Sequence, residues 1–337
     1  MMRSVVFTRH GEPSDVLTVT DTPDTEPSAG EVRIRLTARP VNPSDLLFVR
    51  GRYGRAAGFR PVRRGGPPVA LVGFEGAGVV EKPAPDVHLQ PGDRVAVSAT
   101  GTWQEYLNVP LGDVIEVPDD LPDDLACQMT INPMTANLLL DDLVLSRGDV
   151  LLHTAATSAV GRMITTLARR NGIRCVGLVR RPPTGPELAR LQDADVLHVS
   201  AEPHDRAREQ IAAFAGKQGV AAAIDAVGGA TGRLALDCLR DGGRMVVYGM
   251  LSGSAIPIPP ELLVFRGISV DGFWLPERLA GMLPEQSGEL TRRVADQLVG
   301  RQLGAPVAGR YDLAEVKRAV LHCESTPGSD GKALLVG

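Results

Sequence analysis

Residues 148–161 read GDVLLHTAATSAVG. The apolar run Val150–Thr154 predicts a buried strand, and the small residues after it predict a tight turn. A helix is expected from Arg162 to about Asn171, followed by a second strand at Arg174–Val179. The segment therefore predicts a βαβ unit with parallel strands.

The turn inside this unit is a degenerate form of the dinucleotide-binding fingerprint. Ala156, Ser158 and Gly161 stand where GxGxxG has its glycines, and Ala159 and Val160 belong to the same turn. Small residues let the backbone approach a pyrophosphate, and the helix N-terminus offers N–H donors and a positive dipole. We expect these five residues to bind a dinucleotide; an ordinary βαβ turn built from Ala and Ser is the alternative.

The residues at the end of the second strand indicate which dinucleotide is bound. Arg180 and Arg181 follow the strand, and no acid occurs before Glu187. NAD sites place an acid there for the ribose hydroxyls, whereas two cations suit a 2′-phosphate. The sequence therefore predicts NADPH rather than NADH.

Three further strands are predicted at Asp195–Val199, Val220–Val227 and Arg244–Tyr248. Glycines follow two of them, at Gly228 and Gly249. Ligands of open α/β sheets lie at the carboxyl ends of the strands, so both glycines are candidate cofactor-lining positions.

The regions before and after this α/β segment differ from it in residue pattern. Residues 3–117 contain short β-type runs between Gly and Pro turns, and these are Val5–Arg9, Glu31–Ala38, Val69–Glu81, Asp93–Ser98 and Asp113–Val117. A final strand is expected at Lys332–Val336. We expect a β-barrel-like domain formed by residues 1–117 and 266–337, an α/β domain over residues 118–265, and an active cleft at their junction.

Composition excludes several classes of protein. The net charge of −4 argues against a generally basic nucleic-acid binder, and no apolar run is long enough to span a bilayer. The N-terminus has neither a signal-peptide core nor an amphipathic transit stretch, so a cytoplasmic protein is expected. The four cysteines form no CxxC pair, which argues against a disulfide framework.

Motifs of the first domain complete the pattern. They are Val41-Asn42-Pro43-Ser44-Asp45, Gly51-Arg52-Tyr53-Gly54, Gly73-Phe74-Glu75-Gly76 and Pro91-Gly92-Asp93-Arg94-Val95. In this domain order they resemble the medium-chain dehydrogenase/reductase family, which implies a Rossmann domain with a GroES-like catalytic domain. Zinc-using members carry ligands where this chain has Asn42, Phe74 and Ile131, which cannot supply them, so no metal is expected.

Within the zinc-free branch, four stretches resemble the mitochondrial-type enoyl-thioester reductases. They are Thr102-Trp103, Ile131–Ala136, Tyr248-Gly249-Met250, and Val264-Phe265-Arg266 leading to Gly272-Phe273-Trp274-Leu275. The resemblance implies that Tyr248, Met250, Phe273 and Trp274 line the cofactor, that Thr135 faces the nicotinamide and that Trp103 contacts substrate. Quinone and enone reductases, including a secondary-metabolism tailoring enzyme, remain the alternative, and a cofactor-binding protein without activity is a third.

The reaction implied is reduction of a trans-2-enoyl thioester of CoA or acyl carrier protein, with hydride added at Cβ and a proton at Cα. Without a metal the developing enolate needs a protein donor, and the Tyr53 phenol is the candidate acid. Asn42 and Ser44 are expected to orient cofactor or substrate. By resemblance we also expect a homodimer, paired through an edge strand near Gly267–Phe273.

The loop that contains Tyr53 is rich in arginine. Between residues 50 and 64 it contains no acid and carries Arg50, Arg52, Arg55, Arg60, Arg63 and Arg64. We expect Arg52 and Arg55 to bind the phosphates of coenzyme A or an acidic carrier-protein surface. A solvated loop without a ligand is the alternative.

Overall fold

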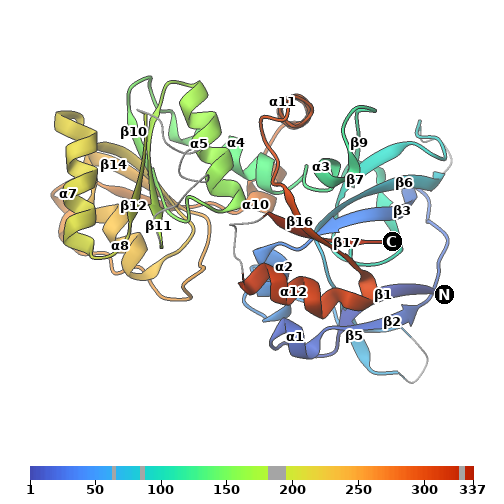
Figure 1. Cartoon of the computed structure of the whole chain (residues 1–337). Coiled ribbons are helices and arrows are strands. Elements are labelled where there is room, and N and C mark those ends of the chain that lie inside the picture. The colour runs from blue at the N-terminus through green and yellow to red at the C-terminus, as the bar shows by residue number, and fades with distance from the viewer. Residues whose placement is uncertain (63–65, 84–87, 181–194, 326–330) are drawn as a thin grey trace. The chain divides into compact units, whose positions relative to one another are not determined.

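The structure is a computed structural model that describes residues 1–62, 66–83, 88–180, 195–325 and 331–337. The chain forms two compact units (Figure 1). The first comprises Met1–Pro133 and Thr291–Gly337, and the second comprises Met134–Leu290. These divisions differ from the sequence-based boundaries at 118 and 265, because residues 269–272 add a strand to the second unit's sheet.

The second unit is built on a six-stranded sheet in which every neighbouring pair is parallel. Its strands, in spatial order, are β12 (Val196–Ser200), β11 (Arg174–Val179), β10 (Val150–His153), β13 (Val220–Asp225), β14 (Leu239–Val247) and β15 (Ser269–Gly272). The order reverses between β10 and β13, which is the topological switch point of a doubly wound sheet. The predicted α/β fold class is confirmed.

Helices pack beside this sheet (Figure 1). They are α5 (Ala159–Arg170), α7 (His204–Ala215) and α8 (Gly229–Asp237). The other helices of this stretch of chain are α4 (Asn132–Leu143), α9 (Pro260–Val264), α10 (Leu275–Ala280) and α11 (Pro284–Val299), the last of which runs from the second unit into residues of the first. Helix α5 buries Met163, Ile164 and Leu167, which recur at helical spacing and give it one apolar face. This packing fixes the N-terminus of α5 at the end of β10.

The first unit contains two sheets. The seven-stranded sheet has β16 (Val307–Asp312), β17 (Lys332–Val336), β3 (Glu31–Pro40), β6 (Glu75–Pro83), β7 (Arg94–Ser98) and β9 (Val114–Glu116) in that order, with β8 (Tyr106–Pro110) also paired to β3. The four-stranded sheet has β2 (Thr18–Thr22), β1 (Met2–Phe7), β5 (Pro68–Leu71) and β4 (Arg60–Pro61). Its helices are α1 (Pro13–Val16), α2 (Pro43–Val49), α3 (Asp123–Ala126) and α12 (Val316–Ser325).

One predicted strand of this unit is divided in two. The run Val69–Glu81 forms β5 and β6, which lie in different sheets, because Gly73 between them has φ +97°. A Cβ at Gly73 would lie 2.3 Å from Trp103 Cδ1 and 2.4 Å from Thr102 Oγ1. Only glycine combines this left-handed backbone with so close a neighbour, and the break places Phe74 and Glu75 at the start of β6.

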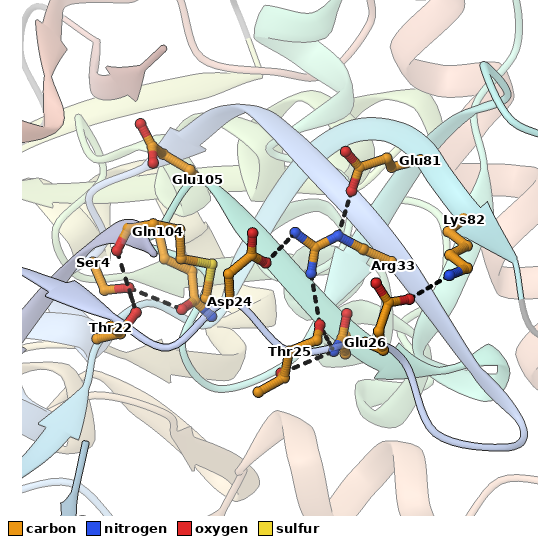
Figure 2. A network of polar contacts seen from close by, with 12 residues as sticks. Ser4, Thr22, Asp24, Thr25, Glu26, Arg33, Glu81, Lys82, Gln104 and Glu105 are labelled. Atoms are coloured by element: carbon orange, nitrogen blue, oxygen red, sulfur yellow. Dashed lines mark hydrogen bonds and ion pairs between the residues drawn. The ribbon is translucent and has the colours of Figure 1, made fainter. Parts of the chain in front are cut away.

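Ion pairs join two interior strands of the seven-stranded sheet, β3 and β6 (Figure 2). Arg33 on β3, which is 8% exposed, donates to Asp24, to Glu81 on β6 and to the Thr25 carbonyl oxygen at 2.7 Å. One buried guanidinium therefore joins two strands and the segment that precedes β3. Within the described residues, none of the helices combines the length and apolar character that crossing a bilayer requires.

Candidate functional site

Helix α2 begins at the residue that stands at a zinc-ligand position of the family. Asn42 is the N-cap and Pro43 the first helical residue, where its fixed φ and missing N–H are tolerated. The Asn42 backbone N–H donates to the Asp45 carboxylate at 2.8 Å, as in a capping box. The side chain of Asn42 also makes hydrogen bonds to residues outside the helix.

That side chain bridges two buried charged residues. Asn42 Nδ2 donates to Glu75 Oε1 at 2.8 Å, and Asn42 Oδ1 accepts from Lys332 Nζ. Asn42 and Glu75 are each 1% exposed and Lys332 is 6% exposed. The cation, the amide and the carboxylate form a continuous chain inside the first unit.

The second oxygen of Glu75 holds the segment that leads into α4. Glu75 Oε2 accepts from Thr130 N at 3.2 Å, Thr130 Oγ1 at 3.1 Å and Ile131 N at 3.0 Å. Burial raises the pKa of the Glu75 carboxyl, while Lys332 and these hydrogen bonds oppose the rise. Burial also raises the pKa of Asp45, to about 8, with a smaller contribution from the nearby Glu75 charge.

These residues do not fit a catalytic zinc. The oxygen of the Asn42 amide is occupied by Lys332, the Phe74 ring has no donor atom and Ile131 offers only hydrocarbon. Across the part of the chain that the structure describes, no three His, Cys, Asp or Glu side chains are grouped so as to hold a metal ion.

Tyr53, the candidate acid, lies against Phe74. Its half-buried ring is 5.1 Å from the Phe74 ring, centroid to centroid, at an interplanar angle of 30°. The Arg55 guanidinium lies 5.6 Å from the Phe74 centroid and donates to Thr100 Oγ1 at 2.8 Å. The structure thus brings Tyr53 and Arg55 to the same ring, that of Phe74.

Two other predicted substrate residues are buried polar groups of the same unit. Trp103 is fully buried and packs in the apolar cluster that includes Phe74 and contacts Tyr53. Its Nε1 and the Ser44 Oγ have no hydrogen-bond partner. The contact of Trp103 and Ser44 with substrate stays a prediction.

In the arginine-rich loop, one arginine is paired with acidic side chains and others are exposed. Arg50 is paired with Glu12, at 2.7 Å, and with Glu324. Arg52, Arg55 and Arg60 are exposed. Arg63 and Arg64 lie outside the described residues, so the described loop presents three of the six arginines to solvent.

In the second unit, the predicted turn joins β10 to α5. Ser158 is the N-cap of α5, and its Oγ accepts from Gly161 N at 3.1 Å. A Cβ on Gly161 would lie 2.5 Å from the Ala155 carbonyl oxygen, and Gly177 gives similar room to the Ala156 methyl. Ala159 and Val160 form the first turn of α5, so all five predicted residues surround this N-terminus.

Two further polar groups hold the carboxyl ends of β10 and β13 together. The Asp225 carboxylate accepts from Thr154 Oγ1 at 2.7 Å, from Val227 N at 3.0 Å and from Gly228 N at 2.8 Å. Thr154 Oγ1 in turn accepts from Ala226 N at 2.8 Å. This fixes the turn carrying Gly228, whose φ is +77°.

Tyr248, at the end of β14, reaches the predicted turn. Its hydroxyl is hydrogen-bonded to Ser158, and burial, aided by the Asp225 charge, raises the pKa of the phenol well above its usual range. Gly249 packs closely on Ala226, where a Cβ would lie 2.7 Å from the carbonyl oxygen. The strand ends that were predicted separately thus converge at the switch point.

The remaining predicted residues are distributed around this unit. Arg180 is exposed at the end of β11, and Arg181 lies outside the described residues. Thr135 is buried in α4, the Phe273 backbone N–H donates to Val247 O at 2.9 Å, and Met250 and Trp274 are 49% and 37% exposed. Their contact with a nicotinamide cofactor stays a prediction.

Sequence reasoning missed Glu75, Lys332, Thr130 and Asp225. Glu75 and Asp225 carried a signal, since each is an acid inside an otherwise apolar or glycine-rich strand. Such acids are buried only with partners. Lys332 gave no such signal, because its partner Asn42 is 290 residues away.

Two family models match the chain: the alcohol dehydrogenase GroES-like domain over residues 28–119 and the zinc-binding dehydrogenase domain over residues 159–291. The mitochondrial enoyl-[acyl-carrier-protein] reductase of Xenopus tropicalis is 30% identical, over 99% of this chain and 95% of its own length.

Two solved structures are also similar. A Bacillus thuringiensis protein assigned as an NADPH:quinone reductase is 31% identical, with a TM-score of 0.88, 100% of this chain covered and 99% of that chain. The enoyl thioester reductase Etr1p of Candida tropicalis, in complex with NADP and crotonyl-CoA, is 25% identical, with a TM-score of 0.84 and the same coverage. Since these similarities span the whole chain and both of its units, the protein belongs to the medium-chain dehydrogenase/reductase family.

Proposed function

We propose that the protein is an NADPH-dependent reductase of trans-2-enoyl thioesters of CoA or acyl carrier protein. The observation that carries the proposal is the placement of the Tyr53 phenol against Phe74, at a position where zinc-using relatives hold a metal ligand. An oxygen that becomes negative there must be stabilised by protein donors. Full-length similarity to an enoyl-[acyl-carrier-protein] reductase supports the same reaction.

The cofactor we propose is NADPH, bound at the switch point of the second unit. The capped N-terminus of α5 offers backbone N–H donors to a pyrophosphate, and the glycine at Gly161 allows close approach. The exposed Arg180 guanidinium suits the 2′-phosphate. When bound, NADPH supplies the hydride that adds to Cβ of the enoyl group.

The protein's own part in the reaction is to supply the proton. As hydride arrives at Cβ, charge develops on the thioester carbonyl oxygen and Cα becomes basic. A tyrosine phenol, with a reference pKa of about 10, carries a proton at neutral pH and is acidic enough to protonate an enolate. The Tyr53 hydroxyl therefore delivers the proton to Cα.

Exposed arginines of the first unit would bind the carrier. Arg52, Arg55 and Arg60 present guanidinium groups near Tyr53 in the sequence. Guanidinium groups bind phosphate in a bidentate manner. Replacing Arg52 and Arg55 by Gln should raise KM for crotonyl-CoA but not for a crotonyl thioester that lacks phosphate.

The proposal is tested by following NADPH oxidation with crotonyl-CoA, hexenoyl-CoA and a simple quinone. We expect kcat/KM for the thioesters to exceed that for the quinone, and NADPH to be preferred to NADH. An absence of turnover on every enoyl thioester overturns the proposal.

A second candidate function is reduction of quinones or free enones. The similarity to the Bacillus thuringiensis protein favours it, since that match has the higher TM-score of the two structures compared. This function predicts turnover of quinones with little or none of thioesters. The same experiment therefore separates the two candidates.

We also propose a homodimer. Strand β15 is the edge of the six-stranded sheet and pairs only with β14 within the described residues. Close to it in sequence, Val264 and Phe265 are 71% and 83% exposed. An open strand edge beside exposed apolar side chains is a surface that a second copy can cover.

A further inference from the structure

We propose that Glu75 and Lys332 are positioning residues of this reductase. Their contacts to Asn42 hold the surrounding segments in place, as the ligands of a metal centre would. Only the catalytic part of this inference rests on the proposed function. Its structural part concerns the chain Lys332–Asn42–Glu75 and stands without any substrate.

The charges at the two ends fix the orientation of the Asn42 amide. The Lys332 ammonium can only donate hydrogen bonds, so it must face Oδ1 of Asn42. The Glu75 carboxylate, when ionised, can only accept, so it must face Nδ2. A flipped amide would place NH₂ against NH₃⁺ and oxygen against oxygen, which makes Asn42 a fixed bridge with both of its polar atoms engaged.

Burial makes each end depend on the other. Glu75 and Lys332 lie almost wholly out of water, where an uncompensated charge is strongly unfavourable. Their mutual attraction acts through Asn42, and Lys332 lowers the pKa of Glu75 against the effect of burial. Removing one charge therefore leaves the other buried without compensation.

The chain also connects the segments that carry the candidate catalytic groups. Asn42 begins α2, whose end leads into the loop of Tyr53. Glu75 follows Phe74, whose ring contacts Tyr53, and holds the backbone of Ile131 just before α4. A shift of the Glu75 carboxylate displaces Phe74, and with it the Tyr53 hydroxyl.

A charge-exchange cycle tests this arrangement. The variants are Asn42→Asp, Glu75→Gln and the double variant. Asn42→Asp places a third carboxyl group beside Glu75 and Asp45, and Glu75→Gln leaves Lys332 without its counter-charge. In the double variant the Asp side chain at 42 can accept from Lys332 and from the new Gln amide, whose oxygen can still accept from Thr130 and Ile131.

We expect both single variants to lose thermal stability and the double variant to regain most of it. With crotonyl-CoA, each single variant should lower kcat on the order of ten-fold, the size seen for strongly coupled contacts, and the double variant should recover it. KM for NADPH should hardly change, because the cofactor binds in the second unit. A purely structural role would restore stability without restoring kcat.

Additive losses in the double variant, in stability and in kcat, would overturn the proposal. If Asn42→Asp does not fold, Lys332→Arg and Lys332→Met decide instead: Arg should retain activity that Met loses, and equal loss contradicts the role. The matched control is Lys82→Met, which removes an exposed lysine paired with Glu26 and should leave stability and kcat unchanged. If the enzyme prefers quinones, the stability cycle still tests the chain, so the two proposals fail separately.

Discussion

At position 42 this chain has an amide, where the sequence resemblance implies a thiolate in zinc-using members of the family. Two charged side chains, Glu75 and Lys332, form hydrogen bonds with this amide. Glu75 and Lys332 give the amide one orientation, and Phe74 fills a second ligand position with a ring that supports Tyr53. The first unit therefore holds a polar chain and a tyrosine at the positions where the sequence resemblance implies the metal ligands of zinc-using relatives.

A buried histidine of the second unit gives a prediction on pH. His153 is fully buried, and burial, aided by the charge of His198, lowers its pKa to about 3 from the ordinary 6.5. Below about pH 6.5 this histidine binds a proton in the unfolded chain but not in the folded protein. The free energy of unfolding therefore falls as pH drops from 6.5 towards 3, by at most about 1.4 kcal/mol per pH unit.

Urea denaturation at several pH values between 4.5 and 7.5, a range that covers about two units of that window and extends above it, measures this effect. We expect His153→Gln to flatten the pH dependence, because the titrating group is gone while a partner for Thr165 can remain. His88→Gln, at an exposed histidine, is the control and should leave the slope unchanged. An unaltered slope in His153→Gln contradicts the account.

Sequence reasoning singled out Tyr53 and Asn42 as candidates but did not predict the residues that they contact. Local motifs carry the candidates, since Asn42-Pro43 and Gly51–Gly54 are short and contiguous. The contact between Asn42 and Lys332 joins residues 290 positions apart and depends on β17 pairing with β3. Neither the pairing nor the direction of a side chain can be read from spacing alone.

At the scale of elements, periodicity located most strands of the sheets, and backbone conformation decided where they end. The predicted strand Arg174–Val179 is β11 without change. The run Val69–Glu81 was predicted as one strand because its residues are apolar, and the left-handed φ of Gly73 divides it. Strand β15 is short and mostly exposed, so hydrophobic periodicity does not mark it; the edge strand expected near Gly267–Phe273 came from the family resemblance.

The start of α5 gives a prediction on an element boundary. Gly161→Ala places a methyl group 2.5 Å from the Ala155 carbonyl oxygen, so the helix must move away from the turn. We expect a loss of stability of about 1–3 kcal/mol, as for other overpacked sites, and weaker NADPH binding measured by fluorescence titration.

Gly288→Ala is the matched control. It lies in helix α11 with nothing within 4 Å of the added methyl, so the better helix propensity should raise stability by up to about 1 kcal/mol. If the two substitutions change stability in the same direction, close packing at Gly161 is not what requires glycine.

At the scale of the whole molecule, the proposed dimer gives a prediction on mass. Light scattering should give twice the chain mass of 35.8 kDa. Val270→Pro removes a backbone donor on the edge strand, and Phe265→Glu places a charge on the exposed apolar surface; either should yield monomers. A wild-type protein that is monomeric at micromolar concentration excludes the dimer.

The cellular location stays a prediction at this scale. The similar protein of Xenopus tropicalis is mitochondrial by name, which does not bear out the expected cytoplasmic location. The chemistry proposed for Tyr53 does not depend on the compartment, because it requires only the cofactor and an activated double bond.

The measurement that tests the central claim most directly compares Tyr53→Phe with the wild type on two acceptors. Proton delivery to Cα is needed for crotonyl-CoA, whereas the oxygens of a quinone can be protonated by water. We expect kcat/KM for crotonyl-CoA to fall about 100-fold or more, the range of a lost general acid, with a much smaller fall for the quinone. Tyr106→Phe, which removes a hydroxyl on β8, should leave both unchanged. Equal activity of Tyr53→Phe and wild type on crotonyl-CoA would contradict the assignment of Tyr53 as the acid.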